Sequence, residues 1–125
     1  MDAAVDASTS QFELNEEQRA IQEMAQAFAA DRVAPNALDW DRRKHFPADV
    51  IRETGPLGLG GIYVRDDVGG SALGRLDAVL IFEALSRADP AFSSFISIHN
   101  MVASMIDRFG NEEQRQRILP KLTSM

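Results

Sequence analysis

The chain contains no cysteine, no long hydrophobic run and no block of basic residues. Without cysteine, a disulfide framework, a thiol nucleophile and a cysteine-ligated metal or cluster are excluded. No apolar run approaches the ~20 residues needed to span a bilayer. The 13 Lys and Arg are scattered and the net charge is −6, which argues against a nucleic-acid partner. We therefore expect a soluble protein without a membrane or nucleic-acid partner.

The first 11 residues, MDAAVDASTSQ, are small, polar and without periodicity, so they predict a flexible tail. They have neither the apolar core of a signal peptide nor the Arg content of a mitochondrial presequence. We expect a cytoplasmic protein of bacterial type, or a mitochondrial matrix protein if a presequence has been removed. With 45% hydrophobic residues, positions 12–125 are expected to form one domain.

Helical periodicity and end signals predict an all-α fold of about six helices, with no strand pattern strong enough for a sheet. Asn15 with Gln18, and Asn111 with Gln114, have the spacing of capping boxes. Pro120 is expected to kink or end the last helix. The predicted helices are Leu14 to Val33, Pro35 to Arg42, one opened by Phe46-Pro47, Leu76 to Ala88, a long one after Pro90 and one that begins at Asn111.

The long helix lacks charge. From Pro90 through Ile106 there is no Asp, Glu, Lys or Arg, although charged residues make up 26% of the chain. Its apolar residues wrap beyond a single stripe, which predicts a central, buried helix. Leu76 to Ala88 is nearly as apolar. Two such helices are unusual in a small helical domain, so they either pack against other domains or subunits, or leave a large apolar patch.

The polar residues of the long helix are ordered. Ser93, Ser97, Asn100 and Ser104 step by four, three and four, and so form one narrow line. In one interpretation the hydroxyls bond to carbonyl groups one turn back and their small size admits a neighbouring helix. In the other, the line is a partly polar wall of a ligand cavity with apolar lining.

Two ionisable residues on these helices have a functional and a structural interpretation. His99, with only one other His in the chain, is a poor metal ligand and is expected to be a hydrogen-bonded core or interface histidine. Glu83 lies mid-helix with Arg87 one turn on, which favours a structural ion pair over a catalytic base.

Glycine is concentrated in one stretch, GLGGIYVRDDVGGSALG. A G-x-G-x-x-G frame begun at Gly58 meets Tyr63 where the third glycine should be, and no G-K-[ST] follows. We interpret Gly69-Gly70 as a tight turn that needs positive φ rather than as part of a phosphate loop.

Four segments together resemble the acyl-CoA dehydrogenase family, specifically its N-terminal helical domain. The resemblance runs from about Phe12 to Met125. The segment that begins with SIHNM is most similar to members that act on isobutyryl-CoA. Members commonly have Pro and a pair of Glu where this chain has Arg65-Asp66-Asp67. The four segments are LNEEQRAIQEMAQAFA, GPLGLGGIYVRDDVGGSALG, LDAVLIFEALSRADP and SIHNMVASMIDRFGNEEQRQRILPKL.

The resemblance implies a flavin-dependent oxidoreductase that dehydrogenates a short, branched acyl-CoA such as isobutyryl-CoA between its α and β carbons. In the family, FAD is held by a middle β domain and a C-terminal helical domain, both absent here. The chain alone is therefore expected to bind no FAD, to contain no catalytic residue and to be inactive. An electron-transfer flavoprotein as acceptor, contacts with the remaining domains and a homotetramer are also implied.

Five residues of the long helix correspond, by the resemblance, to the wall of the acyl end of the substrate cavity. They are Ser93, Ser94, Ser97, Ile98 and Met101. They overlap the polar line described above, which favours its cavity interpretation. A competing hypothesis is a free-standing helical module that uses the same apolar faces to bind a partner protein, without catalysis.

Overall fold

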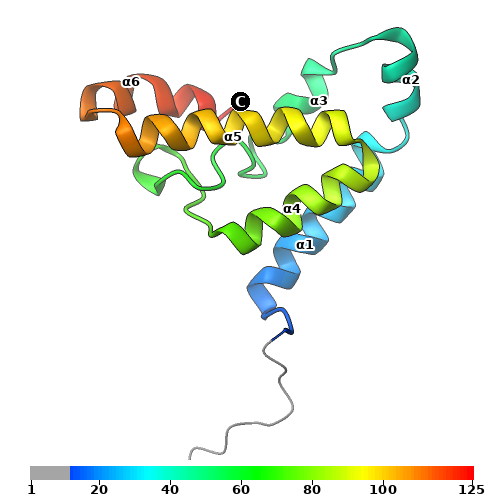
Figure 1. Cartoon of the computed structure of the whole chain (residues 1–125), viewed down its shortest axis with the longest axis horizontal. Helices are drawn as coiled ribbons and strands as arrows, with labels where there is room; N and C mark the ends of the chain where they lie inside the picture. Colours follow the sequence, from blue (N-terminus) through cyan, green and yellow to red (C-terminus); the bar gives the residue numbers. More distant parts are fainter. Residues whose placement is uncertain (1–11) are drawn as a thin grey trace, which may run out of the picture.

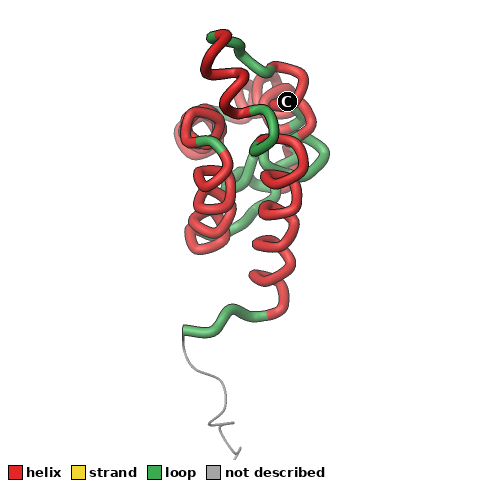
Figure 2. Tube along the Cα trace, turned by 90° about the vertical axis from the view of Figure 1, so that its right-hand side faces the viewer, coloured by secondary structure: helices red, strands yellow, loops and turns green. Residues whose placement is uncertain are grey.

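The computed structural model describes residues 12–125, and the predicted tail, 1–11, lies outside the described residues. Within the described part the chain is helical and has no strand, which confirms the predicted all-α fold (Figure 1, Figure 2). The elements are α1 (Glu16–Phe28), the π-helix η1 (Ala29–Val33), α2 (Ala37–Arg43), α3 (Ala48–Glu53), the 3₁₀ turn η2 (Asp66–Val68), α4 (Arg75–Ala88), α5 (Pro90–Phe109) and α6 (Glu112–Thr123).

The helix starts predicted from capping patterns are confirmed. The Asn15 side chain accepts from the Gln18 amide at 2.8 Å, and the Asn111 side chain accepts from the Gln114 amide at 2.9 Å. Pro120 was expected to kink or end the last helix, and the predicted end was wrong, because α6 continues through it to Thr123. Proline removes one backbone donor, and so close to the end of a helix the remaining bonds are sufficient.

Two apolar clusters hold the helices together. In the larger one, α1 and α4 lie side by side and the N-terminal half of α5 crosses them (Figure 1). The smaller one lies where the glycine-rich loop and η2 meet α5 and α6. It comprises Val64, Val68, Ala103 and Leu119. The two clusters together bury one side of α5 along its length.

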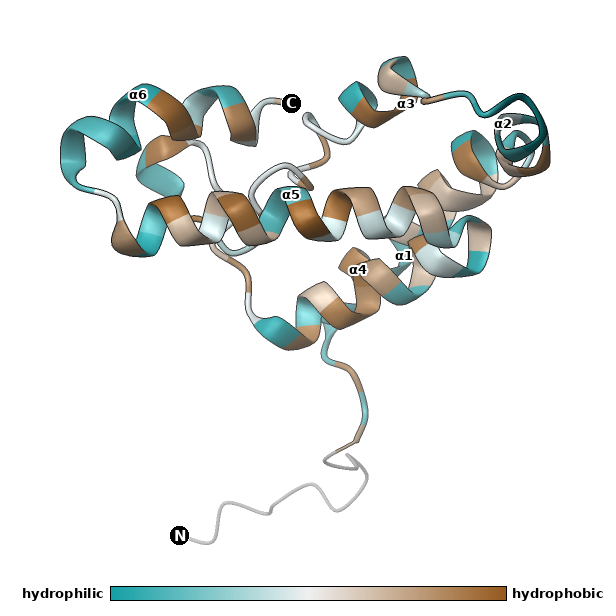
Figure 3. Ribbon diagram, turned by 45° about the horizontal axis from the view of Figure 1, so that its top comes forward, coloured by the Kyte–Doolittle hydropathy of each residue, from teal (hydrophilic) through white to brown (hydrophobic). Residues whose placement is uncertain are grey.

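Burial of α5 and α4 on all sides, as predicted, was wrong within residues 12–125. Only one side of α5 is buried, and α4 leaves Leu76 and Val79 exposed. Hydrophobic segments, coloured brown, recur along α5 (Figure 3). A chain of this size has too few other helices to surround one of 20 residues. Large apolar side chains on α5 and α4 are exposed within this chain, and packing of these surfaces against other domains or subunits stays a prediction.

The glycines of the loop serve packing. Gly69 has φ of 87°, the left-handed conformation predicted for the turn. A Cβ atom at Gly60 would lie 2.6 Å from the Thr123 carbonyl oxygen, and one at Gly61 would lie 2.6 Å from Thr123 Cγ2. The loop can therefore approach the end of α6 only because side chains are absent, which supports the structural interpretation of the glycines.

Candidate functional site: the outer face of α5

The uncovered side of α5 carries large, exposed apolar side chains along much of the helix. Its large side chains range from 39% to 76% exposed. No charged side chain interrupts it between Pro90 and Ile106. We call this surface the outer face of α5, and it comprises Ser94, Phe95, Ile98, Met101, Val102, Met105 and Phe109.

The structure divides the five sequence-predicted wall residues between two sides of α5. Ser94, Ile98 and Met101 lie together on the outer face, because steps of four and three return to the same side of a helix. Ser97 is half-buried at the edge of that face. Ser93 is buried, and its hydroxyl donates to the Phe82 carbonyl oxygen at 3.2 Å. Four of the five can therefore contact a molecule laid against the outer face.

Polar side chains on the inward and lateral sides of α5 bind the glycine-rich loop. Asn100 is fully buried, accepts from the Ile62 amide at 2.7 Å and donates to the Leu59 carbonyl oxygen at 2.8 Å. Nε2 of His99 lies 3.0 Å from the Gly60 oxygen and 2.9 Å from the Leu122 oxygen. Since both partners are acceptors, Nε2 carries the proton. The predicted hydrogen-bonded histidine is confirmed.

Sequence reasoning missed an ionic cluster at the C-terminal end of α5. Arg115, only 2% exposed, donates to Asp107 at 2.8 Å, to both carboxylate oxygens of Asp67 at 2.8 and 3.1 Å, and to Glu112 at 2.8 and 3.0 Å. Asp107 also accepts from the Arg65 amide at 3.2 Å. The atypical Arg65 and Asp67 are thus the residues that tie the loop to α5 and α6.

The cluster shifts the ionisation of its members. Burial alone would raise the pKa of Asp107, but hydrogen bonds from Arg115 and Arg65 outweigh it and hold that pKa below its usual value. A hydrogen bond from Arg115 likewise lowers the pKa of Asp67. The pKa of Arg115 is raised by its hydrogen bonds to Asp67 and Asp107, so it stays charged throughout the accessible range.

We expect stability to fall when these carboxylates are protonated. Because their pKa values are lower in the folded chain than in the unfolded one, the stabilisation is complete above about pH 4 and disappears as the pH falls through the folded values. Urea unfolding between pH 7 and pH 2.5 measures this. Asp107→Asn should weaken the fall of the unfolding free energy at acid pH. The same fall in that variant as in the parent would contradict the assignment.

The expected ion pair between Glu83 and Arg87 is absent from the described part of the chain. Glu83 is exposed, and within residues 12–125 no ion pair joins it to Arg87, so the predicted pair was wrong. An exposed glutamate is hydrated and needs no partner.

The described residues contain no group of three or more His, Cys, Asp or Glu that could hold a metal ion. No helix among them is long and apolar enough to cross a membrane.

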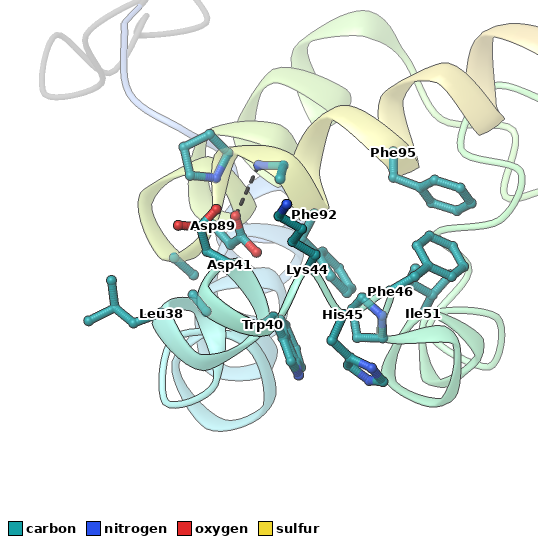
Figure 4. A pocket seen from close by; sticks show the side chains of 15 residues that line it. Leu38, Trp40, Asp41, Lys44, His45, Phe46, Ile51, Asp89, Phe92 and Phe95 are labelled. Carbon is teal, nitrogen blue, oxygen red and sulfur yellow. Dashed lines mark hydrogen bonds between the residues drawn. The ribbon is translucent and has the colours of Figure 1, made fainter.

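A cleft of about 680 Å³ lies between α2 and the N-terminal end of α5 (Figure 4). Trp40 and Phe92 stack in it with ring centroids 6.2 Å apart, and Phe95 belongs to both the cleft and the outer face. Asp41 and Asp89 lie among its lining residues. Lys44 lies among the same lining residues, so the cleft is not uniformly acidic. The cleft extends the apolar surface of α5.

Comparisons with known proteins agree with this architecture. Residues 15–125 match the model of the family described as "Acyl-CoA dehydrogenase, N-terminal domain". Isobutyryl-CoA dehydrogenase of Dictyostelium discoideum, a mitochondrial protein, is 55% identical over 112 residues. These residues are 90% of this chain and 27% of that protein. The chain therefore belongs to the acyl-CoA dehydrogenase family and matches its N-terminal domain.

Solved structures give the same result. Butyryl-CoA dehydrogenase of Megasphaera elsdenii superposes with a TM-score of 0.83 at 26% identity, over 92% of this chain and 31% of that one. The FAD complex of PigA superposes with a TM-score of 0.85 at 28% identity, over 92% of this chain and 31% of that one. The chain spans between a quarter and a third of each of these relatives.

Proposed function

We propose that the chain is the acyl-side part of a flavin-dependent acyl-CoA dehydrogenase, with the outer face of α5 forming one wall of the substrate cavity. Ser94, Ser97, Ile98 and Met101 contact the acyl group in this proposal. The observation that carries it is the uncovered, charge-free outer face in a chain that belongs to this family. An apolar wall with a few small polar groups suits an acyl chain.

The substrate class follows from the relatives and from side-chain size. The 55% identical relative is named for isobutyryl-CoA, a short branched thioester. Ser94 and Ser97 are small and leave width beside α5, while Ile98 and Met101 supply apolar contact. We therefore propose a short, branched acyl-CoA as substrate, with an electron-transfer flavoprotein as acceptor and a homotetramer as assembly.

FAD belongs to this proposal as the group that accepts hydride when bound. As the resemblance implies, we assign FAD binding to the other domains of the enzyme rather than to this chain. In this proposal the chain positions the acyl group and excludes water. Helix α5 closes the acyl end of the cavity against water, and its side chains orient the acyl group.

A segment exchange tests the proposal. Residues 12–125 replace the matched segment of the Dictyostelium discoideum isobutyryl-CoA dehydrogenase, and the chimera is assayed with isobutyryl-CoA. At 55% identity we expect a folded flavoprotein with kcat/KM within about tenfold of the parent.

Two controls make the exchange decisive. The parent enzyme sets the reference for flavin content and rate. A chimera carrying Ser97→Phe should retain flavin but lose most of its activity. If the chimera without Ser97→Phe were well folded and fully loaded with flavin but inactive, the acyl-wall assignment would be contradicted.

The second candidate function, a helical interaction module, uses the same outer face. Its support is the exposure of Met101, Val102, Met105 and Phe109, because neighbouring exposed apolar side chains are typical of protein-binding surfaces. The module predicts a defined hetero-complex without flavin. The segment exchange separates the two candidates, because an interaction module has no reason to restore acyl-CoA oxidation.

A further inference from the structure

Hydrophobicity does not explain the rotation of α5 about its own axis. The apolar residues that α5 buries are Phe92, Ile96 and Ala103. The outer face carries six large apolar side chains and leaves them exposed. Burial of apolar surface is non-directional and scales with area, so on its own it would favour turning the outer face inward. Ile106 adds a partly buried contact with the smaller cluster, but within residues 12–125 apolar burial alone still does not select the observed rotation.

Three buried polar residues lie along the inward side of α5. Ser93, Asn100 and Asp107 follow one another at intervals of seven residues, which is close to two helical turns. They are 4%, 0% and 7% exposed. The sequence pattern had grouped Ser93 and Asn100 with Ser97 and Ser104, but those two are only half-buried. We call Ser93, Asn100 and Asp107 the polar ladder.

Each member of the polar ladder binds a different segment. Ser93 donates to the Phe82 carbonyl of α4 at 3.2 Å and accepts from the Ser86 hydroxyl at 2.8 Å. Asn100 exchanges hydrogen bonds with residues 59 and 62 of the glycine-rich loop. Asp107 accepts from the Arg65 amide and from Arg115 of α6. Among the described residues no buried side-chain nitrogen or oxygen lacks a partner.

Rotation of α5 would break all of these bonds at once. Hydrogen bonds are directional, and a buried donor or acceptor without a partner is unfavourable. The partners would also lose bonds: the buried Ile62 amide would lose its acceptor, and the Arg115 guanidinium would lose one of its three carboxylate partners. Buried polar groups of this kind are known to select one arrangement among several of similar apolar burial.

We infer that Ser93, Asn100 and Asp107 are positioning residues that fix the rotation of α5 and so keep Ser94, Ile98 and Met101 on the outer face. The rotation itself follows from this chain alone. That it sets the width of an acyl cavity rests on the proposed function. The ladder explains why a nearly apolar helix presents one defined face.

Thiol labelling can measure the rotation, because the chain has no native cysteine. Ile96→Cys reports the inward side and Met105→Cys the outer face. These positions are nine residues apart, which places them on opposite sides of a helix. In the full 125-residue chain we expect Met105→Cys to react with a maleimide at least 100-fold faster than Ile96→Cys. Adding Asn100→Leu should reduce that ratio at least tenfold, with Met105→Cys slower and Ile96→Cys faster.

The slower reaction at Met105→Cys separates positioning from mere stability. Local or global opening accelerates labelling at a buried site but does not protect an exposed one. Leu85→Ala is the matched control, because Leu85 is fully buried on α4 and lies outside the polar ladder. It should accelerate Ile96→Cys and leave Met105→Cys unchanged. An unchanged Met105→Cys rate in the Asn100→Leu chain would overturn the inference.

If circular dichroism shows that the Asn100→Leu chain does not fold, Asp107→Asn replaces it. This variant keeps the side-chain shape and removes the charge that Arg65 and Arg115 hold. We expect a fall of at least threefold in the labelling ratio, again with Met105→Cys slower, and an unaltered rate there overturns the inference. Neither flavin nor acyl-CoA takes part, so failure of this test is distinct from failure of the proposed function.

Discussion

Asp107→Ala is expected to lower the free energy of unfolding by about 3 kcal/mol. The substitution removes the acceptor for the Arg65 amide and one of the three carboxylate partners of Arg115, namely the most deeply buried one, while Arg115 remains buried. A buried charge that loses one partner is destabilising, because its hydration is not restored. Urea unfolding at pH 7, followed by circular dichroism, measures the change.

The neighbouring aspartate provides the control for this prediction. Asp66 is exposed and its side chain belongs to no ion pair among the described residues, so Asp66→Ala should change stability by less than about 0.5 kcal/mol. If the two variants were equally stable, the cluster around Arg115 would be a surface feature, and the account of how α5 is anchored would be wrong.

Ser94→Phe, made in the complete gene product, is expected to reduce kcat/KM for isobutyryl-CoA by roughly 10- to 150-fold. Ser94 lies on the outer face, where a phenyl ring would occupy the width that we assign to the branched acyl group. Because Ser94 is exposed in this chain, the substitution should leave folding intact. Steady-state assays with isobutyryl-CoA and with a straight-chain acyl-CoA measure the effect.

Ala27→Phe is the matched control, since it adds the same ring at an exposed position of α1. Its kcat/KM should stay within about twofold of the parent. Equal activity of Ser94→Phe and Ala27→Phe, at equal flavin content, would remove Ser94 and its neighbours from the cavity wall.

The sequence predicted the features of this fold that depend on neighbouring residues. Asn15 and Asn111 cap their helices as expected, because the capping interaction spans only three positions. The turn at Gly69 followed from the requirement for positive φ. The helix end expected at Pro120 is absent, because that residue lies in the last turn of α6, while the alternative of a kink stays a prediction.

The features that depend on distant residues could not be predicted. Arg115 and Asp67 are 48 positions apart, and nothing local pairs them. The one available signal was Asp107, the only acidic residue of α5, which lies eight positions before Arg115. Whether α5 is buried on one side or on all sides depends on how many other helices pack around it. The composition of α5 does not reveal that number.

The most direct test of the central claim is the flavin spectrum of the complete gene product during titration with isobutyryl-CoA under anaerobic conditions. The account predicts bound FAD whose visible absorbance bleaches with isobutyryl-CoA, and bleaches less readily when Ser94→Phe is present. A protein that binds no flavin, or whose flavin no short acyl-CoA bleaches, would contradict the assignment of the outer face of α5 as an acyl-side wall.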